Sequence, residues 1–386
     1  MKKILVVHNK YRNLGGEDTS VVNEVNFLKE HYRVEILYFE NNITNYFSQF
    51  FYFITGKNLH SKKIFSRKLD SYNPDIVYVH NTWFKTSVSI FDELEKRNIK
   101  TVVKMHNFRY YCSRYFLQSK HIIDKKSCQA CGLVYRKRRL LNKYFDDSII
   151  KSIFLTIYSK KLIKKLNSSN VKPLVLTNFH KNFIRSKDII KNKIDVIPNY
   201  LDTSLYKSKG TKENEKKYIV YAGRLSKEKG LPELISAFEK SNLNDVTLKI
   251  CGEGPLEIKK YINKDIKNIE ILGVLPNDEI RKIISNSLAV VTATKLFEGQ
   301  PTLLCEASAS GVISIFPKTG GIQEFFPSDN LFSYEQFNYE ELTNKIELLK
   351  DRELINKQAA LNSLLIKEKL DETELVKKFN EVFENE

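Results

Sequence analysis

LAVVTATKLFEGQPTLLCEASASGVISIFPKTGG, residues 288–321, is the stretch around which the rest of the chain can be interpreted. It opens with an apolar run that predicts a buried strand. Residues 292–300 then form a polar loop that carries Glu298, and a short helical segment with Glu306 follows. Two carboxylates placed in this way, one in a loop and one in a helix, can contact two different parts of one ligand.

The ends of this short helix are marked by residues that favour them. Pro301 stands at the expected first helical position, and Gly311 lies just past the last one. The backbone amides near Thr302 and Leu303 would have no partner within the helix, so they could bind a phosphate or sugar oxygen. On spacing alone, an ordinary capped helix with one surface glutamate and one salt-bridged glutamate is an equal alternative.

Length and composition bound the class of protein. At 386 residues the chain predicts two or three domains, and 42% hydrophobic with 28% charged residues is typical of a soluble globular protein. No apolar run reaches the roughly 18 residues of a membrane span, and Met1-Lys2-Lys3 leads into a strand-like run without a cleavage site. Five cysteines do not suggest a secreted disulfide framework. We therefore expect a cytoplasmic protein.

Positive charge is concentrated in the first half of the chain. Residues 1–200 hold 37 Lys and Arg against 16 Asp and Glu, whereas residues 201–386 hold 26 against 30. A basic half of this kind could bind nucleic acid, an anionic membrane leaflet or an anionic substrate.

Short β-rich runs alternate with helix-like segments, which is the pattern of a parallel, doubly wound α/β sheet. In the first half these runs occupy residues 4–8, 34–39, 75–80, 101–106, 173–178 and 194–199. The pattern restarts after a polar segment at 203–217, with strands expected within 217–238, 247–262 and 269–284. We expect two Rossmann-like, doubly wound domains that face a cleft.

Three of the first-half runs end in histidine, at His8, His80 and His106. Ligands of open α/β sheets bind beyond the carboxyl ends of the strands, so these imidazoles are candidates to line a site. For each one a hydrogen bond to a loop is the simpler explanation, and His106 is the strongest functional candidate. Gly15 and Gly16 follow the first strand and would let a phosphate approach the backbone, although a plain tight turn is the commoner reason for such a pair.

Residues 107–170 interrupt the alternation and contain Cys112, Cys128 and Cys131. The last two have C-x2-C spacing and could hold zinc with a histidine as the fourth ligand. Three cysteines without a second such pair are incomplete evidence, so we expect free thiols and no metal.

Basic and aromatic residues are interleaved at 133–166, which holds ten Lys and Arg against two Asp, and again at 47–68. Such stretches are typical of a surface that binds anionic lipid. A solvated helix face packed on the sheet explains them nearly as well.

Arg224 and Lys229 directly follow a strand of the second half, in a loop bounded by glycines. Two fixed cations near a helix N-terminus suit a diphosphate, whose negative charge grows as it departs from a sugar. The alternative is that both are ordinary exposed cations of a loop. Taken together with Glu298 and Glu306, the two cations favour a ligand site over this alternative.

Four ordered motifs of the second half resemble the nucleotide-sugar domain of the retaining GT-B glycosyltransferases of family 4. They are AGRLSKEKG (222–230), CGEGP (251–255), GVLPNDEI (273–280) and EGQPTLLCEASASGVISIFPKTGGIQE (298–324). PDIVYVHN (74–81), MHNF (105–108) and VIPNYLD (196–202) resemble the first domain and the junction of the same family. The resemblance covers most of the chain, in the family's order.

The resemblance implies a role for each motif. Arg224 and Lys229 would bind the donor diphosphate, Glu298 would face the donor sugar, and Glu306 would hold the ribose hydroxyls. His106 would lie near the transferring carbon. The other donor-site residues would be the amides near Thr302 and Leu303, the base-bordering segment of Gly252, Gly254, Pro255 and Val274, the position of Gln300, and the loop of Gly15 and Gly16.

The implied domains are an acceptor-binding domain at 1–200 that contains the cysteine insertion, a donor-binding domain at 201–365, and a last helix near 366–386 that crosses back to the first domain. Gln300 stands where an aromatic residue is usual in the family, which leaves the donor sugar open. No D-x-D pair occurs, so the implied transfer needs no metal, and the two cations stabilise the leaving diphosphate.

From the residues and the resemblance together we expect a retaining glycosyltransferase without a cofactor. Its donor would be a UDP or GDP sugar, and its acceptor a lipid-linked glycan of bacterial surface polysaccharide such as capsule. It would bind peripherally to the inner face of the cell membrane through 47–68 and 133–166, and it would not bind nucleic acid. The alternatives are a nucleotide-sugar epimerase of the same fold and a non-enzymatic basic lipid- or nucleic-acid-binding protein.

Overall fold

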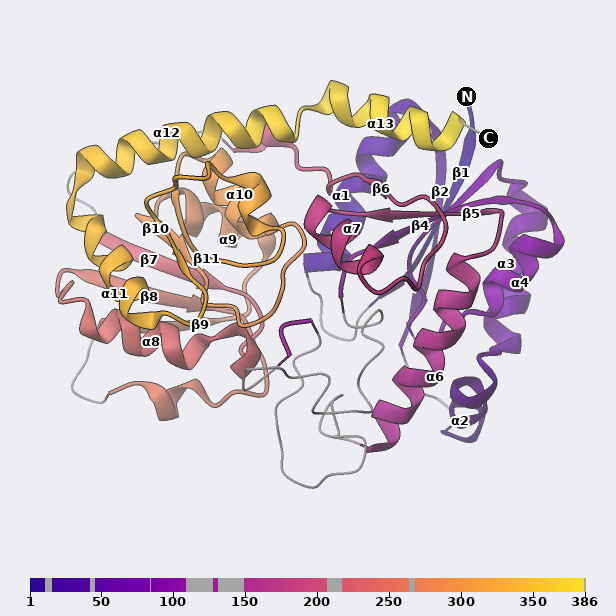
Figure 1. Ribbon diagram of the computed structural model, residues 1–386, viewed down its shortest axis with the longest axis horizontal. Coiled ribbons are helices and arrows are strands. Elements are labelled where there is room, and N and C mark those ends of the chain that lie inside the picture. Colours follow the sequence, from indigo (N-terminus) through magenta and orange to yellow (C-terminus); the bar gives the residue numbers. More distant parts are fainter. Residues whose placement is uncertain are drawn as a thin grey trace. The chain divides into compact units, whose positions relative to one another are not determined.

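The computed structural model describes residues 1–10, 16–41, 46–83, 85–108, 128–130, 149–206, 217–263 and 268–384. The chain forms two compact units (Figure 1). Unit 1 comprises Met1–Tyr200 and Glu372–Glu386, and unit 2 comprises Leu201–Asp371. The last segment of unit 1 thus begins at Glu372.

Unit 1 is built on a parallel six-stranded sheet in the order β2-β1-β3-β4-β5-β6. Each β-rich run of the first half contributes one strand. The strands are β1 (Lys3–Lys10), β2 (Arg33–Glu40), β3 (Ile76–Asn81), β4 (Lys100–Met105), β5 (Val171–Val175) and β6 (Asp195–Val196). The helices are α1 (Gly16–His31), α2 (Tyr46–Thr55), α3 (Leu59–Tyr72), α4 (Ser89–Lys96), α6 (Ile149–Leu166), α7 (Asn178–Arg185) and α13 (Glu372–Glu384).

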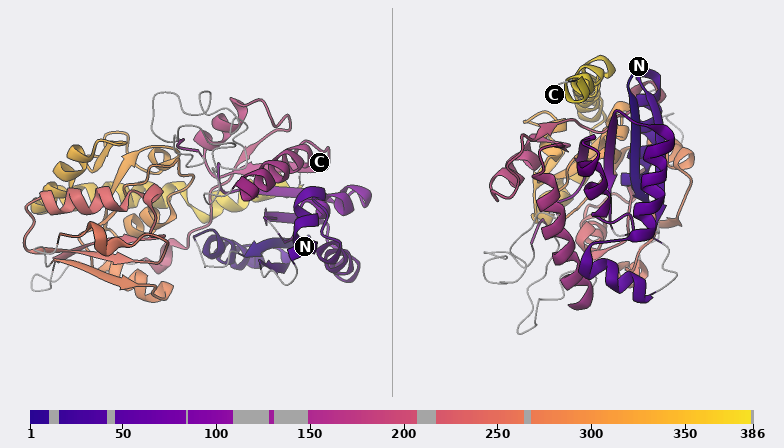
Figure 2. Two further views of the ribbon diagram at one scale, coloured as in Figure 1. Left: turned by 90° about the horizontal axis from the view of Figure 1, so that it is seen from below. Right: turned by 90° about the vertical axis from the view of Figure 1, so that its right-hand side faces the viewer.

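Successive residues of the central strands of unit 1 pack on opposite faces of the sheet, as the two-residue repeat of a strand requires. Val7 and Val79 join a core with α3, α4, α6 and α7, whereas Val6 and Tyr78 join a core with α1 and α13. Figure 2 shows helices on both faces of this sheet. The two ends of the chain lie near each other in unit 1 (Figure 1), where the Lys2 ammonium donates to the Phe383 carbonyl at 2.8 Å.

Unit 2 repeats the design with the strand order β12-β11-β10-β7-β8-β9. Its strands are β7 (Lys217–Ala222), β8 (Val246–Cys251), β9 (Ile269–Gly273), β10 (Ala289–Val291), β11 (Ile313–Lys318) and β12 (Ser333–Glu335). Its helices are α8 (Leu231–Lys240), α9 (Asn277–Ser285), α10 (Thr302–Ala309), α11 (Tyr339–Glu347) and α12 (Arg352–Lys369), with short 3-10 turns η3 (Thr203–Leu205), η4 (Lys227–Lys229), η5 (Ile258–Tyr261), η6 (Ile322–Phe325) and η7 (Leu348–Lys350). The predicted pair of doubly wound units is confirmed.

The opening stretch, residues 288–321, forms β10, a loop, α10 and β11 in succession. Pro301 precedes the helix as its N-cap instead of occupying the first helical position. Gly311 has a φ of 75° just past the helix, a conformation that glycine adopts without strain. None of the described helices is long and apolar enough to cross a membrane.

Candidate functional site

The loops that follow β7 and β10, two neighbouring strands, are bound to each other. The Lys295 amide donates to the Glu228 carbonyl at 2.9 Å, and the Lys295 ammonium donates to Glu233 at 2.6 Å. Gly230 permits this approach, because a Cβ there would lie 1.9 Å from the Ala293 carbonyl oxygen. The residues carried by the two loops are therefore held together at the carboxyl edge of the sheet, where ligands of such folds bind.

Glu298 is the centre of this arrangement. Its carboxylate accepts from the Lys229 ammonium at 2.6 Å and from the Thr294 hydroxyl at 3.0 Å. The loop after β11 fixes the backbone of Glu298, because the Gly321 amide donates to its carbonyl at 2.8 Å, and a Cβ on Gly320 would lie 2.4 Å from the same oxygen. The structure thus brings together the predicted sugar-facing carboxylate and one of the predicted diphosphate-binding cations.

Arg224 lies in the same loop as Lys229 and forms an ion pair with Glu228. Its side chain is 55% exposed, and the Tyr221 hydroxyl donates to its backbone carbonyl at 2.9 Å. Burial, followed by the nearby Glu298 carboxylate, raises the pKa of Tyr221 and keeps that hydroxyl protonated. Each predicted diphosphate-binding cation thus lies against a carboxylate: Arg224 pairs with Glu228 of the same loop, and Lys229 pairs with Glu298 of the loop after β10.

The loop after β8 approaches the loop after β7 through its glycines. A Cβ on Gly252 would lie 2.0 Å from the Gly223 carbonyl oxygen, and a Cβ on Gly254 would lie 2.2 Å from the Leu225 carbonyl oxygen. The glycines of CGEGP are therefore needed for backbone packing. Pro255 and Val274 are exposed beyond these turns.

The close approach at Gly252 gives a stability prediction. Gly252 has a φ of 130° and no room for a methyl group, so Gly252→Ala should lower the free energy of unfolding by about 2 kcal/mol or more. Gly273→Ala is the control, because Gly273 has a φ of 71° but nothing within 4 Å of a Cβ, and it should cost only about 1 kcal/mol. Urea unfolding compares the two, and equal losses would show that the contact with Gly223 is unimportant.

The N-terminal turn of α10 is partly occupied by its own loop. The Thr302 amide, one of the two expected to bind an oxygen of the ligand, donates to the Gln300 carbonyl at 3.0 Å. The Gln300 side chain is buried, with 7% of the residue exposed, and Leu303 is half-buried.

Glu306 lies inside α10 with partners that the sequence did not suggest. The Tyr206 hydroxyl, from the segment after the first unit, and the Arg281 guanidinium lie close enough to the Glu306 carboxyl to affect its charge. Burial raises the pKa of Glu306 to about 7, although the Tyr206 hydroxyl and the Arg281 charge both act to lower it. Near neutral pH this carboxyl is thus poised between its protonated and ionised forms.

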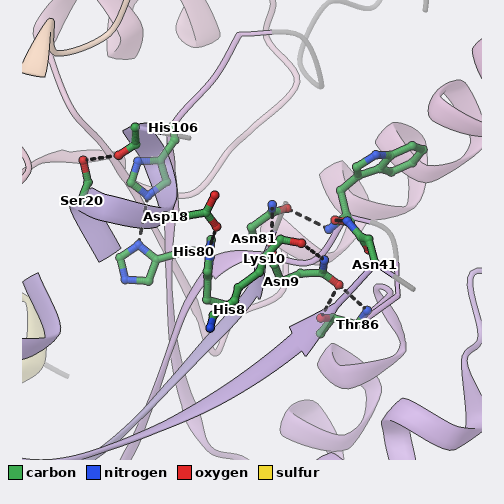
Figure 3. Close-up of polar contacts among 12 residues, drawn as sticks. His8, Asn9, Lys10, Asp18, Ser20, Asn41, His80, Asn81, Thr86 and His106 are labelled. Carbon is green, nitrogen blue, oxygen red and sulfur yellow. Dashed lines mark hydrogen bonds and ion pairs between the residues drawn. The ribbon is translucent and has the colours of Figure 1, made fainter. Parts of the chain in front are cut away.

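The three candidate histidines of unit 1 lie together near the carboxyl ends of the adjacent strands β1, β3 and β4, with His8 and His80 inside their strands and His106 just after β4 (Figure 3). His80 Nδ1 and His106 Nε2 are 3.0 Å apart, and the two rings are stacked with their centroids 5.3 Å apart. His8 Nε2 lies 2.8 Å from the Asp18 carboxylate and its ring makes an edge contact with His80. The sequence therefore predicted the three positions but not the direct contact between His80 and His106.

A buried ion pair beneath this cluster was also missed. Glu24 of α1 and Lys104 of β4 are fully buried and form an ion pair, and the Lys104 ammonium also donates to the Pro198 carbonyl at 3.1 Å. The Tyr78 hydroxyl donates to Glu24 at 2.5 Å. A lysine inside the otherwise apolar run TVVKMH was the available signal, because a buried lysine requires a partner.

Several predicted residues lie outside the described part of the chain, among them Gly15, Cys112, Cys131 and residues 133–148. Gly16 begins α1, and a Cβ there would meet nothing within 4 Å. Cys128 is half-buried and packs against the core of unit 1. The zinc alternative is therefore not tested by the described residues.

Most of the second unit matches the sequence model of a known protein family. Residues 202–363 match the sequence model of the family described as Glycosyl transferases group 1. These residues make up most of unit 2. The motifs with Arg224, Lys229, Glu298 and Glu306 all lie within the matched residues.

Two curated relatives match part of the chain. The chain is 27% identical over 184 residues to the gpi3 subunit of phosphatidylinositol N-acetylglucosaminyltransferase from Schizosaccharomyces pombe. This alignment covers 45% of the chain and 40% of that protein. The chain is 25% identical over 146 residues to a phosphatidylinositol N-acetylglucosaminyltransferase subunit from Arabidopsis thaliana. This alignment covers 36% of the chain and 32% of that protein. The matches thus span less than half the length of either relative.

Solved structures resemble the chain over its whole length. Anabaena HepE, solved with UDP and glucose, has a TM-score of 0.68 at 16% identity and covers all of both chains. Sucrose-phosphate synthase from Thermosynechococcus elongatus has a TM-score of 0.73 at 12% identity, with 100% of this chain and 98% of that chain covered. The chain has the GT-B fold of these structures.

Proposed function

We propose that this chain is a glycosyltransferase that moves a sugar from a UDP or GDP donor to a lipid-linked acceptor. The observation that carries the proposal is the contact between Lys229 and Glu298, with Arg224 in the same loop. A match of residues 202–363 to the group 1 family model and a fold like that of HepE with UDP and glucose support it. Transfer of radiolabel from UDP- and GDP-sugars to a membrane lipid extract tests it, and no transfer with any donor would contradict it.

In the proposed reaction Lys229 and Arg224 stabilise the charge that grows on the diphosphate as it leaves the sugar. Glu298, held by its Lys229 and Thr294 contacts, orients the sugar and stabilises positive charge that develops on it. The configuration is retained without a protein nucleophile, and a donor phosphate oxygen accepts the proton of the acceptor hydroxyl. The two cations take the place that a metal ion has in metal-dependent transferases.

Glu306 is proposed to accept hydrogen bonds from the ribose hydroxyls, and its pKa then makes donor binding depend on pH. Two donating hydroxyls favour the ionised carboxylate. Since burial holds the pKa of Glu306 at about 7 in the free protein, binding must release a proton below that pH. The affinity for UDP-glucose should therefore rise as the pH rises from about 5.5 to about 7, by up to about tenfold per unit, and then level off.

Calorimetric titration with UDP-glucose checks this dependence, because a diphosphate esterified at both ends keeps a constant charge over the range. Glu306→Gln removes the titrating group and should give a flat profile. The same slope in the Glu306→Gln variant would exclude Glu306 as its source. The free protein should also lose stability as the pH rises from 4.5 to about 7, because the folded state keeps a proton that the unfolded chain has released.

The acceptor side of the proposal rests on an exposed apolar surface of unit 1, which we call the α2–α6 patch. It comprises Phe47, Phe50, Phe51 and Ile54 of α2 and Ile150 and Ile153 of α6, and Phe47 is 90% exposed. Phe50 packs edge-on against Phe154 at 5.7 Å, which joins the two helices. The opposite face of α6 packs in the core of unit 1 through Leu155, Tyr158 and Leu162, so the sheet-packing explanation of 149–166 also holds for that face.

Exposed basic side chains lie on α6 itself, on the turn after α2 and on α3, the next helix in the chain. The exposed cations of α3, α6 and the turn before α3 are Lys57, Lys63, Arg67, Lys160 and Lys164. Exposed aromatic residues flanked by lysines suit the interface of an anionic bilayer. The two curated relatives are named for transfer to phosphatidylinositol, a lipid, which supports a lipid-linked acceptor here. We therefore propose peripheral binding to a membrane that carries the acceptor, in surface-polysaccharide assembly.

Removing two aromatic rings of the patch should weaken this membrane binding strongly. Phe47→Ser/Phe51→Ser leaves the Phe50–Phe154 contact intact, and each ring contributes about 1.5–3 kcal/mol when it leaves water. Sedimentation with vesicles of phosphatidylcholine containing one-third phosphatidylglycerol should show at least tenfold weaker binding. The matched control is Leu361→Ser/Leu364→Ser, which removes exposed apolar side chains of α12 and should bind as the wild type does. Equal binding by both double variants would contradict a role for the patch.

A further inference from the structure

His106 touches another histidine, and the position of the protons on the two rings decides what His106 can do. His106 Nε2 lies 3.0 Å from His80 Nδ1, so one of these nitrogens donates to the other (Figure 3). Burial lowers the pKa of both imidazoles well below the usual value, and the Lys104 ammonium lowers both further. Both rings are therefore neutral at pH 7, and each carries a single proton.

The other nitrogen of His80 faces a carboxylate. His80 Nε2 lies 3.8 Å from Glu24 Oε1, and both side chains are about 1% exposed. The Glu24 carboxylate accepts from the Tyr78 hydroxyl at 2.5 Å and pairs with the buried Lys104 ammonium. A negative oxygen at this distance favours an N–H over a nitrogen lone pair. The His80 proton therefore resides on Nε2, and Nδ1 is an acceptor.

The remaining neighbours leave this assignment unchanged. His8 approaches the His80 ring edge-on at 6.3 Å and directs its own Nε2 to Asp18. On the other side a small cavity, lined by Asn81, Thr82, Asn107 and Tyr158 among others, borders both rings. Lys104 also lines this cavity, and its ammonium is paired with the Glu24 carboxylate.

We propose that His80, oriented by Glu24, is a positioning residue that fixes His106 as the tautomer with its proton on Nε2. Nδ1 of His106 then carries a lone pair, and it accepts a hydrogen bond from a substrate hydroxyl. The identity of that hydroxyl rests on the proposed function. The tautomer itself does not, since it follows from contacts within unit 1.

Ring nitrogen NMR of the full chain tests the tautomer without substrate. His106 should show a protonated Nε2 and an unprotonated Nδ1 at pH 7 in the wild type. His80→Asn places an amide oxygen close to the former Nδ1 and should keep this pattern, whereas His80→Leu offers no acceptor and should give a mixture of the two tautomers. A wild-type His106 with its proton on Nδ1, or an unchanged pattern in His80→Leu, would overturn the proposal.

Transfer kinetics give the second readout. His80→Leu should lower kcat about tenfold or more, with the affinity for the nucleotide sugar within about threefold of the wild type, and His80→Asn should restore most of kcat. Equal loss in the two variants would indicate a merely structural role. Glu24 is unsuitable for replacement, because the buried Lys104 would lose its counter-charge. If no transfer activity exists at all, the NMR result still decides the tautomer.

Discussion

Replacing Arg224 and Lys229 together, by Ala and Met, should weaken the binding of the nucleotide-sugar donor about 100-fold. Hydrogen bonds from charged groups each contribute about 1.5–3 kcal/mol, and the loss of two of them corresponds to this factor or more. The fold should persist, since Arg224 is more than half exposed and Glu298 keeps its contact with the Thr294 hydroxyl. Isothermal titration with the donor measures the change, and thermal unfolding verifies the fold.

Lys227→Ala is the matched control for this double variant. Lys227 carries the same charge on the same short turn, η4, and its side chain is exposed. If the double variant acted only by reducing the positive potential, Lys227→Ala would weaken donor binding as well. If Arg224 and Lys229 form a defined diphosphate site, Lys227→Ala should leave donor binding unchanged. Unchanged donor binding in the double variant, or an equal loss in the Lys227 variant, would remove the two cations from the site.

Glu298→Gln should slow transfer about 10²- to 10³-fold while changing donor affinity much less. The amide keeps an oxygen that can accept from Lys229 and Thr294, so the loop geometry remains and only the negative charge is lost. A charge that stabilises the transition state more strongly than it stabilises the bound donor raises kcat. Removal of one such group typically lowers kcat by this factor.

Single-turnover kinetics with saturating donor measure the effect. Glu270→Gln, an exposed carboxylate on β9, should transfer at the wild-type rate. Undiminished transfer by a folded Glu298→Gln enzyme would show that this carboxylate plays no part in the chemistry.

Most of the fold could be predicted because the strand signals are local. Runs such as ILVVH and DIVYVH are apolar and short, and their regular alternation with helical segments predicts a parallel sheet. The strands β11 and β12 were not predicted, because their sequences carry weak strand signals and they form by pairing with neighbouring strands of the sheet. β11 contains a serine and a proline and pairs with β10, and β12 has three residues at the edge of the sheet.

The site was predictable to the extent that its residues lie in motifs. Arg224, Lys229, Glu298 and Glu306 could be named from the sequence, but their contacts could not. Tyr206 reaches Glu306 from about 100 residues earlier in the chain, and nothing in the spacing of either residue indicates that encounter.

The buried pair in unit 1 shows the same limit. A lysine in TVVKMH indicates that a partner exists, but Glu24 is one of several acidic residues near the start of the chain, and only the packing of α1 on the sheet selects it. Residue type predicts the chemistry that a site can hold, whereas non-local packing decides which groups meet.

The central claim is that unit 2 binds a nucleotide sugar through Arg224, Lys229 and the Glu298 loop. A thermal-shift screen of UDP-, GDP- and ADP-sugars on the wild type and the Arg224/Lys229 double variant tests it most directly. A donor at about 100 times its Kd stabilises the folded state by about 2.7 kcal/mol, so we predict a rise of about 5 °C or more in the wild-type Tm with one nucleotide class and little rise in the double variant. No rise with any nucleotide sugar, or the same rise in both proteins, would contradict the claim.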